Sequence, residues 1–199
     1  MMQISSFPGA DADDVDELAK GIQGCGVELQ IILMCGGADP MSPAGEEAIF
    51  EQLMNGLEAA KKYNVVHVAS TSFEEWMVPG ATAKEGADFD AAVAQLVTLH
   101  VRAFNEAGLA NSCVKSWDLE FLRAGEFQTF TNIAKAWSVV AGINKELGQP
   151  FFKLMVDAAH CGNSSLNMLE NSKLIAQLAV ADELGIFHAS SPTTRGCLS

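Results

Sequence analysis

Hydrophobic positions along the chain follow two alternating periods, and the alternation predicts helices and strands in turn. Apolar residues recur at intervals of three and four in several segments, which is the spacing of one buried helix face. Shorter, continuous apolar runs lie between these segments and are typical of buried strands. The pattern predicts helices over residues 11–25, from 43 onward, and over 88–107, 127–147 and 165–184, and strands over 27–33, 64–70, 113–121, 151–157 and 186–189.

The order of these elements predicts an α/β fold. One helix comes first, and five strands follow with a helix between each pair. Strict alternation with short connections from helix to strand predicts a parallel sheet covered by helices. Gly108 and Gly148 follow two of the helices, and Pro150 lies just beyond the second, as is typical of helix ends. Because no linker or repeat interrupts the pattern, residues 1–199 are expected to form a single domain.

Polar residues stand at the ends of three predicted strands. The run from Phe151 stops at Asp157, and His160 follows three residues later. The strand before it ends at Glu120, and the last strand reaches His188. The carboxyl ends of parallel strands meet at one edge of a sheet, where α/β enzymes carry their active sites. Two carboxylates and an imidazole that meet there predict a site for a divalent metal ion.

Each of these residues also has a simpler interpretation. Taken alone, Glu120 is a solvated residue at a strand end. His188 is equally well explained as a histidine packed in the core, and His160 as a core histidine or the start of the next helix. Asp157 is harder to explain in this way, because a charge that ends a buried strand is costly unless it is paired or ligated.

Several other side chains that can carry chemistry are interpreted as structural. His100 lies on a predicted helix, and Cys161 has no base partner in the sequence pattern that would activate its thiol. Glu74 and Glu75 lie in a long polar loop and are expected at the surface. The neighbouring Trp76 either stacks on the ring of a ligand or packs the loop against the fold.

The composition limits the partners and the location of the protein. The chain has 12 basic and 25 acidic residues and a formal net charge of −13, which argues against nucleic-acid binding. No apolar run approaches membrane-spanning length, and the N-terminal residues lack the features of a secretory signal. The five cysteines include no C-x-x-C pair and are expected to be reduced. We therefore expect a cytoplasmic protein with no nucleic-acid or membrane partner.

Three blocks of sequence carry a family resemblance. Residues 119–126 are similar to an E-P-L-N-R-G-E segment, residues 156–160 to a D-x-x-H segment, and residues 188–196 to a strand with a histidine and a nearby arginine. These segments are typical of the xylose-isomerase-like TIM-barrel superfamily of sugar isomerases and epimerases, and the chain most resembles its D-tagatose and D-psicose 3-epimerase branch. The resemblance implies a partial (β/α)8 barrel of about five parallel strands, which lacks strands one, two and eight.

The resemblance also implies roles for individual residues. Glu120 would act as a catalytic base, the sugar would be contacted by Glu126, His160 and Arg195, and the metal would be bound by Glu120, Asp157 and His188. Oxygen and imidazole ligands suit Mn²⁺, with Co²⁺ and Mg²⁺ as alternatives. The implied reaction is proton transfer at the carbon next to a ketose carbonyl, with the metal stabilising the enediolate.

The chain departs from the family at two points. Arg123 and Ala124 replace an Asn-Arg pair, which leaves the particular sugar undefined. In the family, the eighth strand carries a fourth metal-binding glutamate that is also the second base, and no strand is predicted after 186–189. A five-strand piece leaves unpaired sheet edges, so we expect it to form homo-oligomers.

Three functions remain open at this point. The first is a metal-dependent sugar isomerase or epimerase of carbohydrate metabolism. The second is another enzyme of the superfamily, such as a hydroxypyruvate isomerase or an inosose dehydratase. An endonuclease-IV-like nuclease is disfavoured, because the chain has four histidines and a strongly negative charge. The third is a partial barrel that binds metal or sugar without full catalytic activity.

Overall fold

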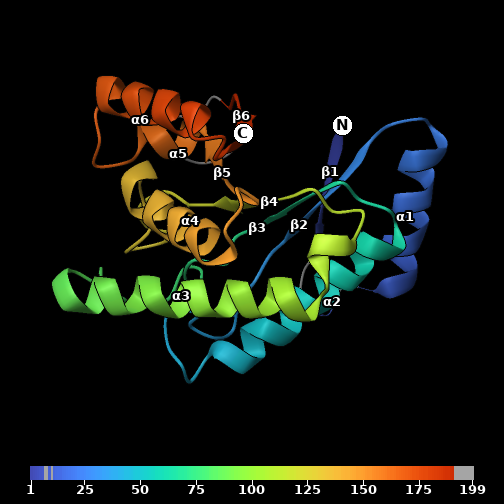
Figure 1. Ribbon diagram of the computed structural model, residues 1–199, viewed down its shortest axis with the longest axis horizontal. Coiled ribbons are helices and arrows are strands. Elements are labelled where there is room, and N and C mark those ends of the chain that lie inside the picture. The colour runs from blue at the N-terminus through green and yellow to red at the C-terminus, as the bar shows by residue number, and fades with distance from the viewer. Residues whose placement is uncertain (7–8, 10, 191–199) are drawn as a thin grey trace.

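The computed structural model describes residues 1–6, 9 and 11–190, and in them the fold is built on one parallel sheet (Figure 1). Six strands lie side by side in chain order, and every neighbouring pair is parallel. The strands are β1 (Met2–Ser6), β2 (Leu29–Leu33), β3 (His67–Ser70), β4 (Ser116–Glu120), β5 (Phe152–Asp157) and β6 (Leu184–His188).

A helix follows each of the first five strands. Figure 1 shows α2, α3 and α4 along one side of the sheet, with α1 and α6 near its opposite ends. A sheet whose strands pair in chain order through helical crossovers is the arrangement of a (β/α)8 barrel, so the predicted α/β class and partial barrel are confirmed. The helices are α1 (Ala12–Gly24), α2 (Glu46–Lys62), α3 (Gly86–Glu106), α4 (Ile133–Leu147), α5 (Ala158–Gly162) and α6 (Met168–Val180), and a short 3₁₀ helix, η1, covers Leu109–Asn111.

The predicted number of strands was wrong by one. Met2–Ser6 forms β1, which pairs with β2 along its whole length, from Met2 beside Leu29 to Ser6 beside Leu33. Of its five residues only Ile4 is buried, so the segment lacks the continuous apolar run that marks the other strands. The strand position next to Leu29–Leu33, which was expected to be missing, is therefore filled.

Two helix predictions also differ from the structure. The Ser42-Pro43 pair does not cap α2, because Ser42 Oγ accepts a hydrogen bond from the Ala44 amide in a turn, and the helix begins at Glu46. The segment after β5 holds two helices instead of one. Asp157 caps the short α5, and Asn167 caps α6 in a reciprocal capping box with Glu170.

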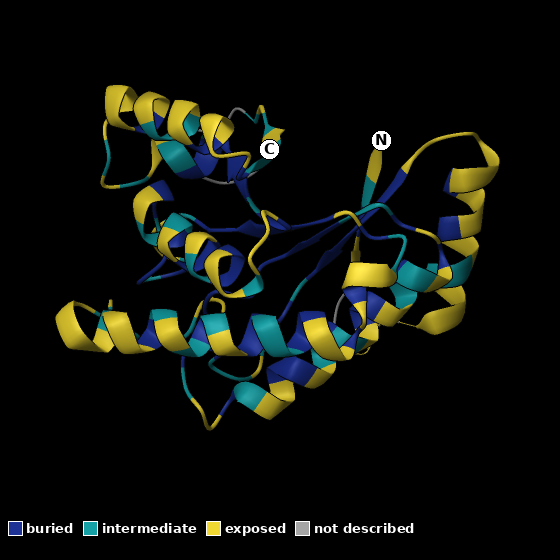
Figure 2. Ribbon diagram, in the orientation of Figure 1, coloured by how far each residue is buried: buried dark blue, intermediate teal, exposed yellow. Residues whose placement is uncertain are grey.

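The main hydrophobic core lies between the sheet and the helices. Trp117, Phe152 and Leu154 are fully buried on this face, and the ring centroids of Phe152 and Trp117 lie 4.9 Å apart. Figure 2 shows the strands largely in the buried colour, and the helices divided between a buried side and an exposed side. β2 and β5 are buried on both faces of the sheet, which explains why they appear in the sequence as nearly continuous apolar runs.

The other face of the sheet is arranged in layers from the amino ends of the strands to the carboxyl ends. The first layer is polar, with Gln3 donating to Gln30, and Ser116 donating to Asp118. A small apolar layer follows, formed by Ile32, Ala69 and Met155 with Met34 and Ile186 packed against it. Beyond it, at the carboxyl ends, the strands place carboxylates and imidazoles on the same edge.

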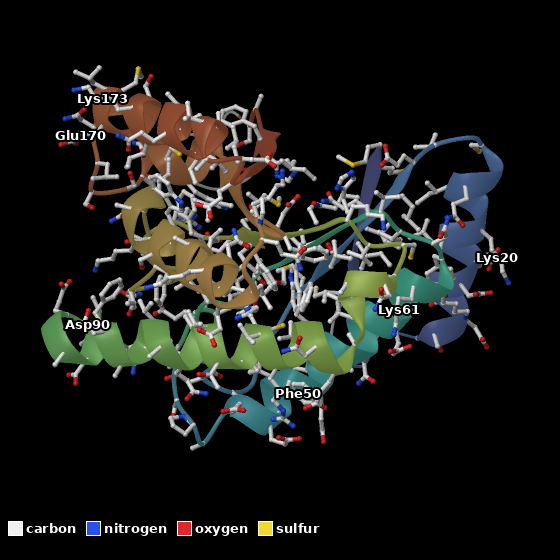
Figure 3. The ribbon with its side chains drawn as sticks, viewed as in Figure 1. Lys20, Phe50, Lys61, Asp90, Glu170 and Lys173 are labelled. Atoms are coloured by element: carbon white, nitrogen blue, oxygen red, sulfur yellow. The ribbon has the colours of Figure 1, made fainter. Side chains whose placement is uncertain are left out.

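The outer faces of the helices carry charged side chains. Figure 3 shows Lys20 on α1, Asp90 on α3 and Lys173 on α6, and all three are exposed. Within the described residues, no helix is both long enough and apolar enough to cross a membrane.

Candidate functional site

The carboxyl ends of three adjacent strands bring the predicted metal ligands together. Glu120, Asp157 and His188 are the last residues of β4, β5 and β6. The pairing of β5 with β6 places Asp157 directly beside His188. Glu120 and Asp157 are 7% and 4% exposed, so both carboxylates lie in an environment where a charge needs a partner.

Four side chains meet at this edge. Glu120, Asp157 and His160 each offer one ligand atom, and these atoms lie within 4.8 Å of one another. His160 Nε2 is 3.5 Å from Glu120 Oε1, and His188 Nδ1 is 3.7 Å from Asp157 Oδ2. The tightest group therefore contains His160, which was predicted to contact substrate, while His188 adjoins the group through Asp157.

Asp157 is held by its neighbours in an ionised form. Its Oδ1 accepts hydrogen bonds from the Ala159 amide, at 2.6 Å, and from the Ser190 hydroxyl. Burial alone would raise its pKa, but His188, Ser190 and the amide together outweigh burial and lower the pKa to about 2. With Oδ1 occupied by these donors, Oδ2 remains directed toward His188 and is the oxygen best placed to bind a cation.

The histidines of the site differ in their surroundings. His160 lies on α5, is 5% exposed, and its Nδ1 has no hydrogen-bond partner among the described residues. The His188 side chain is 35% exposed, and the Asp157 carboxylate raises its pKa. The His160 ring lies with the carboxylates of Glu120 and Asp157, and its Nε2 faces Glu120; this donor set fits a divalent cation, because oxygen and imidazole donors together suit Mn²⁺, Mg²⁺ and Co²⁺.

The loop after β4 carries the predicted substrate residue Glu126. Its carboxylate is mostly buried and forms an ion pair with Arg123, whose Nε lies 3.2 Å from Glu126 Oε2. The geometry of this pair is not that of a hydrogen bond, and Glu126 Oε2 accepts none within the described residues. The loop therefore buries a carboxylate whose charge is balanced by the adjacent Arg123 guanidinium.

One predicted site residue, Arg195, and three other residues near the site are still to be placed. Arg195 lies outside the described residues. The hydrogen bond from Ser190 to Asp157 was not predicted, although Ser190 lies two residues after the histidine that ends its strand. No partner was predicted for Arg123.

Cys161 is a thiol rather than a thiolate, since burial and the charge of Asp157 raise its pKa to about 11.

Comparison with protein-family models and with curated protein sequences found no match. Solved structures do match over nearly the whole chain. A D-allulose 3-epimerase from Methylomonas sp. is 17% identical with a TM-score of 0.71, and the match covers 99% of this chain and 65% of that one. A D-psicose 3-epimerase from Clostridium cellulolyticum H10 is 15% identical with a TM-score of 0.68, covering 95% and 63%. An L-ribulose 3-epimerase is 18% identical with a TM-score of 0.70, covering 95% and 59%.

The chain spans less than two thirds of the length of each of these three structures. At this level of identity the match concerns the fold. The chain has the fold of these sugar 3-epimerases over its six parallel strands and the helices that connect them.

Proposed function

We propose that the protein is a divalent-metal-dependent sugar isomerase or epimerase that moves a proton at the carbon next to a ketose carbonyl. The observation that carries this proposal is the buried group of Glu120, Asp157 and His160, with His188 adjoining it, at the carboxyl edge of the sheet. The fold shared with sugar 3-epimerases supports the same assignment.

Glu120, Asp157 and His188 would hold the metal, with His160 close enough to Glu120 to join them or to bind the sugar. We propose Mn²⁺, with Co²⁺ or Mg²⁺ as alternatives, because the donor set contains carboxylate oxygens and imidazole nitrogens and no thiolate. When bound, the metal supplies electrophilic stabilisation to the oxygens of the enediolate.

The protein groups supply the proton transfer and the orientation. Glu120 would take the proton from the carbon, and the electron pair of the broken C–H bond would enter the enediolate. Return of a proton to the same carbon restores the ketose or its epimer. Glu126, His160 and Arg195 would hold the sugar hydroxyls, since a fixed orientation of the reacting carbon lowers the barrier.

Two alternatives carry different expectations. Epimerisation requires a base on each face of the carbon, whereas an isomerase such as hydroxypyruvate isomerase moves the proton between neighbouring carbons. An inosose dehydratase would instead eliminate water after the same proton abstraction. A barrel without full catalytic activity would perform at most the first step, the exchange of the carbon-bound proton.

Proton exchange in D₂O tests the proposal at its first chemical step. The protein is incubated with Mn²⁺ and D-allulose, D-fructose, D-tagatose or L-ribulose, and the C3 proton signal is followed by NMR. We expect loss of the C3 signal with the wild type and none with E120Q, whether or not an epimer accumulates. Absence of exchange with all these ketoses would reject the proposed function.

We further propose a cytoplasmic homo-oligomer that binds a small sugar. Among the described residues, β1 and β6 each pair on one side only, which leaves two strand edges for another chain. Light scattering should give a mass above that of the monomer, and a monomer at micromolar concentration would contradict this expectation.

A further inference from the structure

Two loops at the carboxyl edge of the sheet are joined into one unit. The first loop runs from residue 71 to 85, after β3, and the second from 121 to 132, after β4. The second loop carries Glu126, the proposed sugar contact. Their connection therefore bears on how firmly that carboxylate is held.

The centre of the connection is Glu74, which is 5% exposed. Its Oε1 accepts a hydrogen bond from the Gln128 amide at 2.8 Å. Its Oε2 accepts from the Thr129 amide at 2.8 Å and from the Phe130 amide at 3.2 Å. Three successive amides thus surround one carboxylate, which is the geometry of a backbone anion site. The expectation that Glu74 lies at the surface was wrong.

Further contacts join the same two loops on either side of Glu74. The Met77 amide donates to the Glu126 carbonyl at 2.9 Å, and the Lys84 amide donates to Thr129 Oγ1 at 3.1 Å. The rings of Phe73 and Phe130 are stacked with centroids 5.2 Å apart. Residues 126 to 130 are consequently fixed at several points to the loop that precedes α3.

The charge of Glu74 is essential to this arrangement. Within the described ranges its carboxylate forms no ion pair with a basic side chain and accepts hydrogen bonds from these three amides alone. A buried carboxylate is costly unless such donors satisfy it. Glutamine would have nearly the same shape, but its NH₂ group would face at least one amide donor and repel it.

We propose that Glu74 is a positioning residue that fixes residues 126–130 and so holds Glu126 toward the sugar. The assignment of Glu126 as the sugar contact rests on the proposed function, whereas the fixing of the segment does not. Glu74 itself need not touch the substrate.

Amide hydrogen exchange tests whether Glu74 fixes residues 126–130. In E74Q, the amides of residues 126–130 and of Met77 should exchange about tenfold to a hundredfold faster than in the wild type, since a charge-assisted hydrogen-bond set is lost. The matched control is E75Q, because Glu75 is the adjacent glutamate and its side chain makes no hydrogen bond among the described residues. Unchanged exchange in E74Q would overturn the proposal, whatever the activity. If E74Q does not fold, E74D keeps the charge on a shorter side chain and should show the same local acceleration.

A double-mutant cycle tests whether Glu74 affects sugar binding through Glu126. With the C3 proton exchange as the assay, E74Q should raise the KM for the ketose about tenfold with a smaller effect on kcat. In the E126Q background, E74Q should cause no further loss, because its effect acts through Glu126. Independent, multiplicative losses would overturn the positioning role. If the wild type shows no proton exchange, the proposed function fails, while the amide exchange still decides whether Glu74 fixes the segment.

Discussion

His100 illustrates how the fold fixes the protonation state of a buried side chain. Its ring donates from Nδ1 to the Leu96 carbonyl at 2.7 Å, so a neutral ring must accept at Nε2, where the Ser72 hydroxyl lies 2.7 Å away. Ser72 in turn accepts from Ser70, and Ser70 accepts from the Trp117 indole at 2.8 Å. Every polar group of this buried chain is satisfied with the imidazole uncharged. Burial accordingly lowers the pKa of His100 from 6.5 to about 4.

This shift predicts a loss of stability in acid. As the pH falls through 6.5, the unfolded chain takes up a proton that the folded protein resists until about pH 4, so the free energy of unfolding falls across this range. The full effect is about 3 kcal/mol. Urea unfolding of the wild type and of H100Q is measured at pH 7.5 and at pH 4.5. The free energy of unfolding of the wild type minus that of H100Q should be about 2–3 kcal/mol smaller at pH 4.5 than at pH 7.5. If this difference in the free energy of unfolding is the same at both pH values, His100 is not held neutral.

Ser190 is the residue outside the predicted set whose effect on the site is most direct. Its hydroxyl donates to the Asp157 oxygen that does not face His188. Such partners orient metal ligands, and their removal typically weakens metal binding about tenfold to a hundredfold. We expect S190A to weaken Mn²⁺ binding by about tenfold, measured by calorimetry. S138A, which removes an exposed hydroxyl on α4, is the control, and equal affinities for the two variants would contradict the role of Ser190.

At the scale of elements, Asn144 connects α4 to two strands at the amino end of the sheet. Its side chain donates to the Phe152 carbonyl and accepts from the Phe152 amide, both at 2.8 Å. It also donates to Glu183, just before β6, at 2.8 Å. The indole of Trp137 donates to the other oxygen of the same carboxylate at 2.5 Å. One helix thereby satisfies backbone and carboxylate groups that would otherwise be buried without partners.

Replacement of Asn144 by alanine should therefore destabilise the fold strongly. The change leaves the Phe152 backbone groups and the Glu183 carboxylate short of partners, which predicts a loss of about 2–4 kcal/mol in urea unfolding. K145A, at the adjacent exposed position of α4, should change stability by less than about 0.5 kcal/mol. A loss in N144A no larger than that in K145A would show that the network contributes little.

The elements could be predicted where burial imposes a clear period. The apolar runs predicted β2 to β6, and the helical stripes predicted α1, α3 and α4 to within a few residues, apart from the later start of α4 at Ile133. β1 could not be predicted in the same way, because only Ile4 is buried in it. The separate helix α5 was missed because Asp157 was considered as a ligand and not as a helix cap.

At the scale of the whole molecule, the order and common direction of the strands place the candidate site. Because all six strands run in one direction, their carboxyl ends share one edge, and residues as distant as Glu120 and His188 reach it together. The sequence could therefore predict that Glu120, Asp157 and His188 end neighbouring strands at this edge, while their roles as ligands stay a prediction. It could not predict their distances, the role of Ser190, or the burial of Glu74, since these depend on how separate loops pack.

The most direct test of the proposed metal site is a crystal grown with Mn²⁺ and measured at the manganese absorption edge. We predict an anomalous peak within about 2.5 Å of carboxylate oxygens of both Glu120 and Asp157, with His188, His160 or both completing the ligands. The same map would distinguish the two histidines as ligand and sugar contact. No peak at this edge of the sheet, or a peak that touches neither carboxylate, would contradict the metal-dependent mechanism.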